Sequence, residues 1–206
     1  MLTRFKEKIQ SLLRAEAEIA YKIGLKPSHL SAAGAVLGAS SGIFYWMTGL
    51  SASDPLRSRV YLFLAVLFLL ASGFLDALDG VLARIYKEAS ARGAFLDSLL
   101  DRYVDSAVYL GIIIGGLCDL LWGILALIGS LLTSYVRARS EALKISMESV
   151  GVFERAERIM LIAASSIISL FWLEALRWGI LILAVATNLT VLQRVIFFFK
   201  SYSKYK

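Results

Sequence analysis

Five aspartates carry most of the chemistry that this sequence can offer. They lie between residues 73 and 106, in a segment that otherwise resembles a membrane span, and are Asp76, Asp79, Asp97, Asp101 and Asp105. A charged side chain at the centre of a bilayer costs about 2.5–3.5 kcal/mol by insertion scales. Five such groups therefore need strongly positive partners, which marks this segment as the candidate functional site.

The spacing of these aspartates predicts two helix faces that carry carboxylates. Asp76 and Asp79 are three residues apart, whereas Asp97, Asp101 and Asp105 repeat every four, so each set projects from one side of a helix. Where two such faces meet, all the ligands are oxygens, which favours Mg²⁺ or Mn²⁺, and less so Ca²⁺, over zinc. Four carboxylates suit two cations, as in sites that stabilise phosphoryl transfer.

The elements that position these aspartates are predicted to be membrane helices. Hydrophobic residues make up 58% of the 206-residue chain, whereas soluble domains have about 45–50%. Spans long enough for a ~30 Å hydrocarbon core are predicted at residues 30–50, 59–84, 95–116, 119–139, 156–174 and 177–199. We expect an all-α integral membrane protein, with an N-terminal juxtamembrane segment at 1–28 and one six-helix domain at 29–206.

The distribution of basic residues predicts how the chain is oriented. One face of the membrane would hold only Arg57, Arg59 and Arg177. The other would hold Arg4, Lys6, Lys8, Arg14, Lys22, Lys26, Arg84, Lys87, Arg92, Arg137, Arg139, Lys144, Arg155, Arg158, Lys200, Lys204 and Lys206. Such an excess marks the cytoplasmic side, so both termini and the aspartate segment are expected there, in the cell membrane. The net charge of +6 is then a topology signal, and nucleic acid is not expected as a partner.

The N-terminal segment has the pattern of an amphipathic helix. Between residues 2 and 23, basic residues alternate with apolar ones at near-helical spacing: Leu2, Phe5, Ile9, Leu12, Leu13, Ile19 and Ile23. This pattern predicts a helix in the cytoplasmic interface of the membrane, attracted to anionic lipid headgroups. Packing on the cytoplasmic ends of the spans is a compatible alternative.

Small residues and an arginine stand at fixed places among the aspartates. The pattern reads Asp76-x2-Asp79-Gly80-x2-Ala83-Arg84-x8-Gly93-x3-Asp97-x3-Asp101. At every fixed position it is similar to the signature of the CDP-alcohol phosphatidyltransferase family. The resemblance covers the whole chain, because six spans behind a short interfacial helix resemble the minimal form of that family.

The resemblance implies a role for each residue of the pattern. Asp76, Asp79, Asp97 and Asp101 would bind two divalent cations, Mg²⁺ or Mn²⁺, at the pyrophosphate of a CDP-linked lipid. Asp101 would also be the general base that takes a proton from the acceptor alcohol, whose oxygen attacks the lipid-side phosphorus and expels CMP. The CDP-binding positions would be Asp76, Asp79, Gly80, Ala83, Arg84, Gly93 and Asp97. A homodimer is also implied.

Two further features near the pattern leave alternatives open. Asp105 lies one turn beyond it and either orients a metal ligand, pairs with Arg102 or another buried arginine, or is purely structural. Before the first span, Pro27-Ser28-His29-Leu30-Ser31 stands where the family often carries Pro-Asn-x-Leu-Thr. We expect Ser28 or Ser31 to cap the first span.

A second cluster, rich in arginine, predicts the acceptor. Arginines that converge beside a metal site favour an anionic acceptor such as a sugar phosphate, whereas the alternative is topology plus ion pairs with Glu141, Glu154 and Glu157. The texts SYVRARSEA and FERAER resemble the branch of the family that makes phosphatidylinositol phosphate or archaetidylinositol phosphate from inositol phosphate. In that branch the residues near the acceptor phosphate would be Ser134, Arg137, Arg139, Arg155, Arg158 and Arg194.

Other readings of the sequence remain to be distinguished. Phosphatidylglycerophosphate synthases carry partly similar text, so glycerol 3-phosphate is an alternative acceptor. An ion transporter would explain buried carboxylates but not the fixed Gly-x2-Ala-Arg between them. The lipid tail, in CDP-diacylglycerol or CDP-archaeol, is open, and Gly111, Gly115, Gly116 and Gly123 permit close packing without locating a dimer interface.

Overall fold

The chain is all-helical in the part that the structure describes. The computed structural model describes residues 13–86, 90–147 and 150–202, where it has seven α-helices and no strand. They are α2 (Arg14–Lys22), α3 (Pro27–Leu50), α4 (Pro55–Ile85), α5 (Ala91–Ile114), α6 (Leu120–Ala142), α7 (Arg155–Ser169) and α8 (Ala175–Tyr202). Helices α3 to α8 lie where the six spans are predicted, so the all-α class is confirmed.

Four of the described helices are long and apolar enough to cross a membrane: α3, α4, α6 and α8. Helix α7 has 15 residues, which cover about 22 Å of a ~30 Å core. Helix α5 has 24 residues, but its first fifteen include Asp97, Asp101, Arg102 and Asp105. The chain is therefore a multi-pass membrane protein, and the count of six spans stays a prediction.

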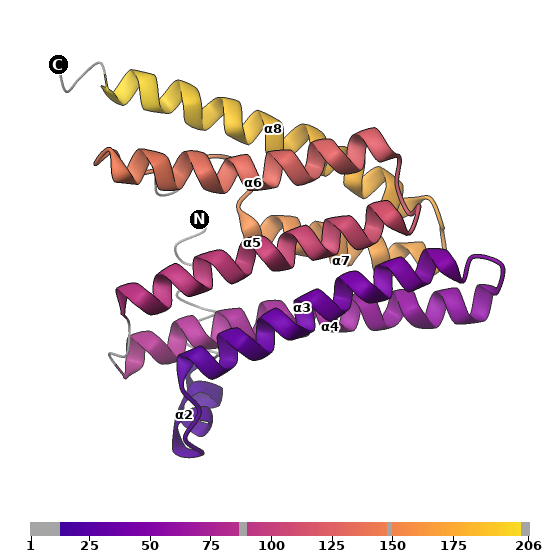
Figure 1. The fold of residues 1–206 in the computed structure, drawn as a ribbon, viewed down its shortest axis with the longest axis horizontal. Helices are drawn as coiled ribbons and strands as arrows, with labels where there is room; N and C mark the ends of the chain where they lie inside the picture. Colours follow the sequence, from indigo (N-terminus) through magenta and orange to yellow (C-terminus); the bar gives the residue numbers. More distant parts are fainter. Residues whose placement is uncertain (1–12, 87–89, 148–149, 203–206) are drawn as a thin grey trace.

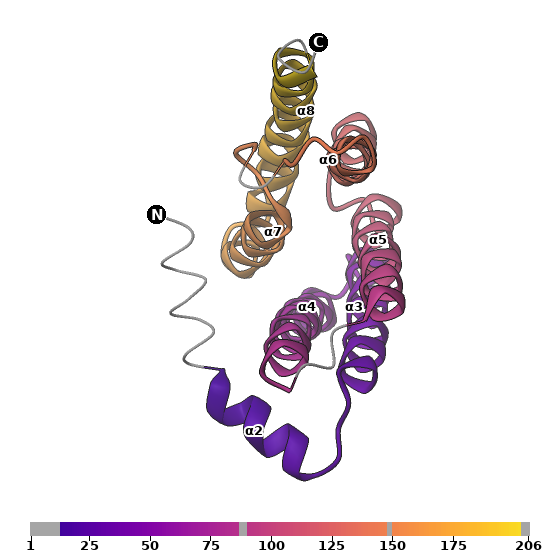
Figure 2. The same ribbon diagram turned by 90° about the vertical axis from the view of Figure 1, so that its left-hand side faces the viewer.

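The long helices run roughly parallel to one another, and α2 lies beside α3 and α4, near the end of the bundle at which α4 ends and α5 begins (Figure 1). We call this the aspartate end. Figure 2 looks along the bundle and shows α3, α4 and α5 in one group, α6 and α8 in a second, and α7 between them. Helix α3 packs on α4 and α5, whereas α7 packs on both α4 and α8. Helix α7 therefore connects the aspartate helices to the rest of the bundle.

Local sequence sets the starts of the three helices that build the aspartate end. Pro27 and Pro55 occupy the first turns of α3 and α4, where a missing N–H costs nothing. Ser90 caps α5 by accepting a hydrogen bond from the Gly93 N–H at 3.0 Å. The expected serine cap of α3 is wrong: Lys26 is the N-cap residue, because proline starts the helix ahead of both serines.

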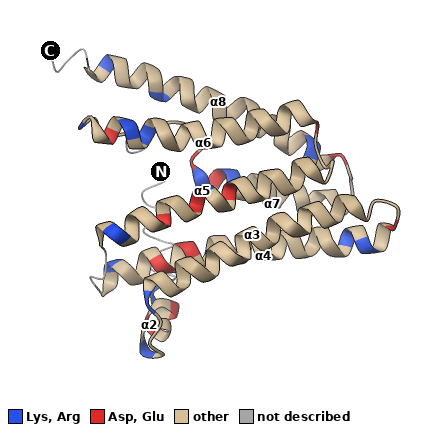
Figure 3. Cartoon of the chain, in the orientation of Figure 1, with Lys and Arg blue, Asp and Glu red and all other residues tan. Residues whose placement is uncertain are grey.

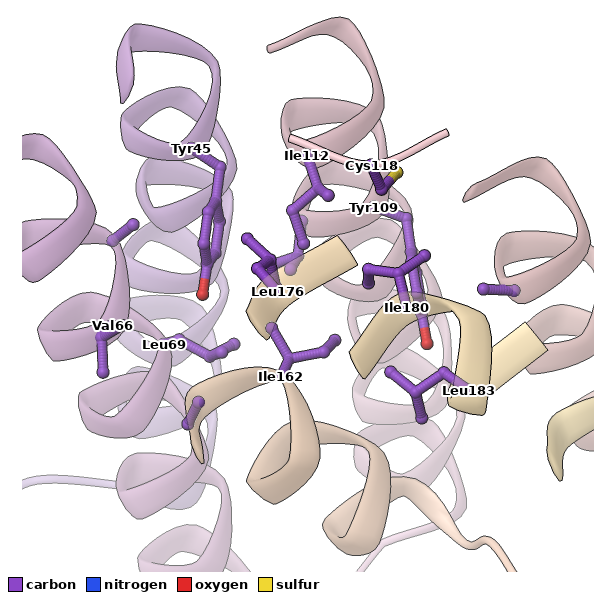
Figure 4. Close-up of a cluster of buried hydrophobic side chains, with 14 of the residues drawn as sticks. Tyr45, Val66, Leu69, Tyr109, Ile112, Cys118, Ile162, Leu176, Ile180 and Leu183 are labelled. Carbon is purple, nitrogen blue, oxygen red and sulfur yellow. The ribbon is translucent and has the colours of Figure 1, made fainter. Parts of the chain in front are cut away.

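The core between the helix groups is apolar, with hydroxyls in pairs. Tyr45, Tyr109, Ile180 and Leu183 lie in this cluster (Figure 4). The Tyr45 hydroxyl forms a 2.8 Å hydrogen bond with Ser166, and Ser130 donates to the Tyr109 hydroxyl at 2.9 Å. Buried hydroxyls need such partners, so these pairs fix α3 to α7 and α5 to α6.

Glycines allow α3 and α5 to touch along their backbones. A Cβ added at Gly111 would collide with the backbone of Gly42, and one added at Gly115 would approach Tyr45 O to 2.8 Å. Gly123 likewise faces the Ile113 side chain. These contacts lie within one chain, so three of the glycines expected to permit close packing do so between helices of the same molecule.

Helix α2 packs on the aspartate end and also presents an apolar face outward. Ala17 and Ala20 are buried in one cluster with the end of α4, and the rings of Tyr21 and Tyr86 stack at 3.6 Å between centroids. Ile19 is 61% exposed. Packing on the bundle is therefore seen, with an outer face still available to the membrane interface. Residues 2–12 of the predicted amphipathic helix lie outside the described residues.

Candidate active site

Helices α4 and α5 bring three of the predicted metal ligands together. Asp76 lies in the last third of α4, and Asp97 and Asp101 lie one turn apart on α5. One carboxylate oxygen from each lies within 4.8 Å of the other two. In Figure 3 the acidic positions of both helices lie in the same half of the bundle, near the start of α7. A cluster of hard oxygen ligands without nitrogen or sulfur fits Mg²⁺ or Mn²⁺.

Asp79 faces a different neighbour. Its side chain is buried toward α3, where the Ser31 hydroxyl donates a 2.6 Å hydrogen bond to Oδ2. The metal-ligand cluster formed by the described residues does not include Asp79. Sequence reasoning missed Ser31 as a site residue, although its position in the Pro27–Ser31 text, where the family often has threonine, was a usable signal.

Arg155 supplies the positive charge that the aspartates require. This first residue of α7 places Nη1 at 3.0 Å from Asp76 Oδ2 and at 2.8 Å from Asp101 Oδ1. Its Nε lies 3.3 Å from Asp105 Oδ1. Because a guanidinium is always protonated in proteins, Arg155 brings a positive charge to Asp76, Asp101 and Asp105 together.

Asp105 also binds a second arginine. Its Oδ2 lies 3.1 Å from Arg158 Nη2, and the two side chains are 11% and 4% exposed. Arg102, the other partner considered for Asp105, instead approaches Asp101 at 3.4 Å and donates to the Ser98 carbonyl. Among the alternatives for Asp105, the structure therefore shows pairing with buried arginines.

A small cavity opens beside the carboxylates. It lies between α3, α4, α5 and the start of α7, and its lining residues are Ser31, Gly34, Ala35, Ser72, Asp76, Asp97, Leu100, Asp101, Val104 and Arg155. Six of these ten residues are polar, namely the three aspartates, Arg155 and the two serines. A phosphate-bearing ligand at this place would meet both the cation ligands and a fixed guanidinium.

The remaining residues of the sequence pattern surround the ends of α4 and α5. Arg84 is exposed, and its Nε donates to the Gly80 carbonyl at 2.8 Å. Ala83 is half-buried on the same turn. A Cβ added at Gly93 would lie 3.1 Å from the Ser90 hydroxyl. The exposed Arg84 guanidinium therefore lies at the end of α4, and little side-chain volume surrounds the backbone at Gly80 and Gly93.

The predicted acceptor residues divide into different environments. Arg194 is 2% exposed and donates to the Thr133 and Val150 carbonyls at 2.6 and 2.8 Å, so it faces the bundle interior as expected. Arg137 pairs with Glu141 at 2.9 Å, whereas Arg139 is exposed. The half-buried Ser134 bonds back to the Ser130 carbonyl. Of these six residues, Arg155 alone forms ion pairs with the cluster of Asp76, Asp97 and Asp101 in the described part of the chain.

Known proteins are similar to this chain in sequence and in fold. The chain is 46% identical over 133 residues to an archaetidylinositol phosphate synthase of Methanothermobacter thermautotrophicus, which covers 63% of this chain and 66% of that one. It is 32% identical over 197 residues to an archaetidylinositol phosphate synthase of Pyrococcus horikoshii, covering 95% of each.

Among solved structures, phosphatidylinositol phosphate synthase of Mycobacterium tuberculosis with CDP-DAG bound has a TM-score of 0.75 and 26% identity, covering 90% of this chain and 92% of that one. The same enzyme in complex with manganese and citrate has a TM-score of 0.76. Residues 26–192 match the model of one family. The chain belongs to the CDP-alcohol phosphatidyltransferase family.

Proposed function

We propose that this protein transfers a phosphatidyl-type group from a CDP-lipid to inositol phosphate and releases CMP. The observation that carries the proposal is the cluster of Asp76, Asp97 and Asp101 around Arg155, at positions that belong to the family pattern. The relatives named archaetidylinositol phosphate synthase and phosphatidylinositol phosphate synthase support inositol phosphate as the acceptor, ahead of glycerol 3-phosphate.

Two divalent cations, Mg²⁺ or Mn²⁺, are the proposed cofactors. Asp76, Asp97 and Asp101 would hold them with Asp79 as the fourth ligand, and the manganese complex of the mycobacterial enzyme supports this assignment. When bound, the cations neutralise negative charge on the pyrophosphate and on the transferring phosphoryl group. The donor set is suitable because hard oxygens are the ligands that both metals prefer.

Three side chains of the protein have the other roles in the proposed reaction. Asp101 takes the proton of the acceptor hydroxyl, and the freed oxygen attacks the lipid-side phosphorus. The bond from that phosphorus to the bridging oxygen breaks, and CMP leaves with the bond's electrons. Arg155, at 2.8 Å from Asp101, favours the charged form of this carboxylate and orients it. Arg84, exposed at the end of α4, can fork onto phosphate oxygens of the nucleotide.

The acceptor phosphate is proposed to bind among the arginines of α6, α7 and α8. Arg155 lies between this proposed phosphate site and the carboxylates. The exposed Arg139 and the half-buried Arg137 lie on α6. Arg194 donates to the Thr133 carbonyl on α6 and to the Val150 carbonyl just before α7, and so ties these two segments to α8. This arrangement provides positive charge next to the base, which a phosphorylated alcohol requires.

The membrane arrangement follows from the helices. We propose six spans, α3 to α8, in one domain over residues 29–206, with both termini and the aspartate end in the cytoplasm. The roughly parallel course of the six helices (Figure 1) and the clustering of basic residues support this arrangement. A soluble acceptor and a membrane-anchored CDP-lipid can meet at such an end. A homodimer in the cell membrane is proposed from family resemblance.

The test is CMP release by the purified protein with CDP-archaeol or CDP-diacylglycerol, inositol phosphate and Mg²⁺ or Mn²⁺. Asp101→Asn should abolish release because an amide cannot take the proton. The control Asp119→Asn alters a carboxylate that is 58% exposed and should leave release intact. If Asp101→Asn released CMP at the wild-type rate, Asp101 would not be the base. If the protein released CMP with glycerol 3-phosphate but not with inositol phosphate, the proposed acceptor would be wrong and the reaction class would stand.

A further inference from the structure

Asp105 has no part in the proposed reaction, yet arginines hold both of its carboxylate oxygens. It lies one turn beyond Asp101 on α5, outside the family pattern. Each of its two oxygens contacts a different arginine, Arg155 Nε at 3.3 Å and Arg158 Nη2 at 3.1 Å. Its side chain is 11% exposed, compared with 37% for Asp76. A carboxylate with both oxygens engaged can turn very little.

Arg158 anchors this carboxylate through its Oδ2 atom. Its side chain is 4% exposed, and its Nε has no hydrogen-bond partner in the described part of the chain. Breaking one partner of such a buried ion pair leaves an uncompensated charge. Arg158 therefore holds Asp105 Oδ2 in place, and Oδ1 remains directed at Arg155, one helical turn earlier on α7.

The contact at Nε decides where Arg155 points. A guanidinium is planar, so a partner fixed at Nε limits the positions that the two Nη groups can reach. With Asp105 at Nε, Nη1 lies between Asp76 and Asp101, at 3.0 and 2.8 Å. If Asp105 were absent, only those two carboxylates would hold the guanidinium, and they would draw it further toward themselves.

We propose that Asp105 is a positioning residue for Arg155, with Arg158 as its buried anchor. It holds the Arg155 guanidinium at the boundary between the carboxylates of the cation site and the region of the acceptor phosphate. Arg155 can then orient Asp101 and face the acceptor without competing fully with cations for Asp76 and Asp101. This inference rests on the proposed function for its acceptor, but its geometry is independent of which phosphorylated alcohol is used.

The test variant is Asp105→Asn in the full-length protein in detergent. Asparagine keeps the shape but offers one oxygen and an NH₂ donor, so it can satisfy only one of the two arginines. The KM for inositol phosphate should rise by about tenfold, as for other partners that orient a site residue, while the KM for the CDP-lipid stays near its wild-type value. A separate equilibrium titration with Mn²⁺ alone, followed by electron paramagnetic resonance, should show the Kd rising by about threefold or more through the shared salt-bridge network.

Two companion variants separate positioning from folding. Asp105→Glu retains both oxygens and should recover part of the acceptor KM and of the Mn²⁺ affinity. Asp119→Asn, at the opposite end of the bundle, should change neither quantity. If Asp105→Asn does not fold, Asp105→Glu decides, because its longer side chain displaces the carboxylate oxygens. A wild-type KM for inositol phosphate together with a wild-type Kd for Mn²⁺ in that variant would overturn the proposal.

A lower melting temperature in Asp105→Asn with unchanged acceptor KM and unchanged Mn²⁺ Kd would show a structural role alone and overturn the inference. Failure of the proposed function has a different result: the wild-type protein would release no CMP with inositol phosphate. In that case the Mn²⁺ titration of wild type against Asp105→Asn still decides whether Asp105 sets the position of Arg155.

Discussion

At the scale of single residues, the site is organised by what holds each carboxylate. Asp76 and Asp101 share the guanidinium of Arg155, whereas Asp79 is held by the hydroxyl of Ser31. The family pattern treats these aspartates as one set, but the structure gives them different partners. The consequence is that each can be perturbed separately, through the group that orients it rather than by removing the carboxylate.

Ser31→Ala tests whether Asp79 is a cation ligand that its hydrogen bond orients. We expect the Kd for Mn²⁺ to rise by about tenfold, the usual effect of removing a partner that orients a metal ligand. Ser31→Thr retains the hydroxyl and should retain the affinity. The exposed Ser28, mutated to alanine, is the matched control. The Kd is measured by titrating the folded protein with Mn²⁺. An unchanged Kd in Ser31→Ala would place Asp79 outside the cation site.

At the scale of elements, the aspartates meet because α3, α4 and α5 pack closely. Helical spacing predicted that Asp97 and Asp101 share a face that meets a second carboxylate face, and the structure places Asp76 of that second face beside them. The sequence could not predict that α3 would turn Ser31 toward Asp79, because that contact joins positions 48 residues apart. It also could not predict that Arg158 would be buried, since an arginine three residues after Arg155 fits an exposed basic face equally well.

Gly111→Ala tests the contact between α3 and α5. The added Cβ collides with the backbone of Gly42, and overpacking of this kind typically costs about 1–3 kcal/mol. We expect a lower melting temperature in detergent and weaker Mn²⁺ binding, because a displaced α5 moves Asp97 and Asp101 relative to Asp76. The control is Gly73→Ala on α4, where the nearest atom to the new Cβ is at 3.8 Å. Equal melting temperatures for the two variants would show that the helices can separate without cost.

At the scale of the whole molecule, charge is distributed unevenly between the two ends. Arg57 and Arg177 stand at the end opposite the aspartates, where each pairs with a neighbouring acid: Arg57 with Asp54, and Arg177 with Glu174. At the aspartate end, Arg137 and Arg139 at the end of α6 and Lys200 at the end of α8 outnumber the acidic residues of those two helix ends (Figure 3). Lysine and arginine in short segments beside spans set orientation, so the asymmetry predicts on which side CMP is released.

Labelling of single cysteines tests this orientation directly. In a Cys118→Ser background, Ser53→Cys lies in the α3–α4 connection and Lys22→Cys at the end of α2, both at exposed positions. A membrane-impermeant maleimide added to intact cells should label Ser53→Cys and spare Lys22→Cys, because the basic aspartate end faces the cytoplasm. Lysis should make both thiols reactive, which controls for access. The reverse pattern in intact cells would place the carboxylates outside, where neither a cytoplasmic nucleotide-linked lipid nor a phosphorylated alcohol could reach them.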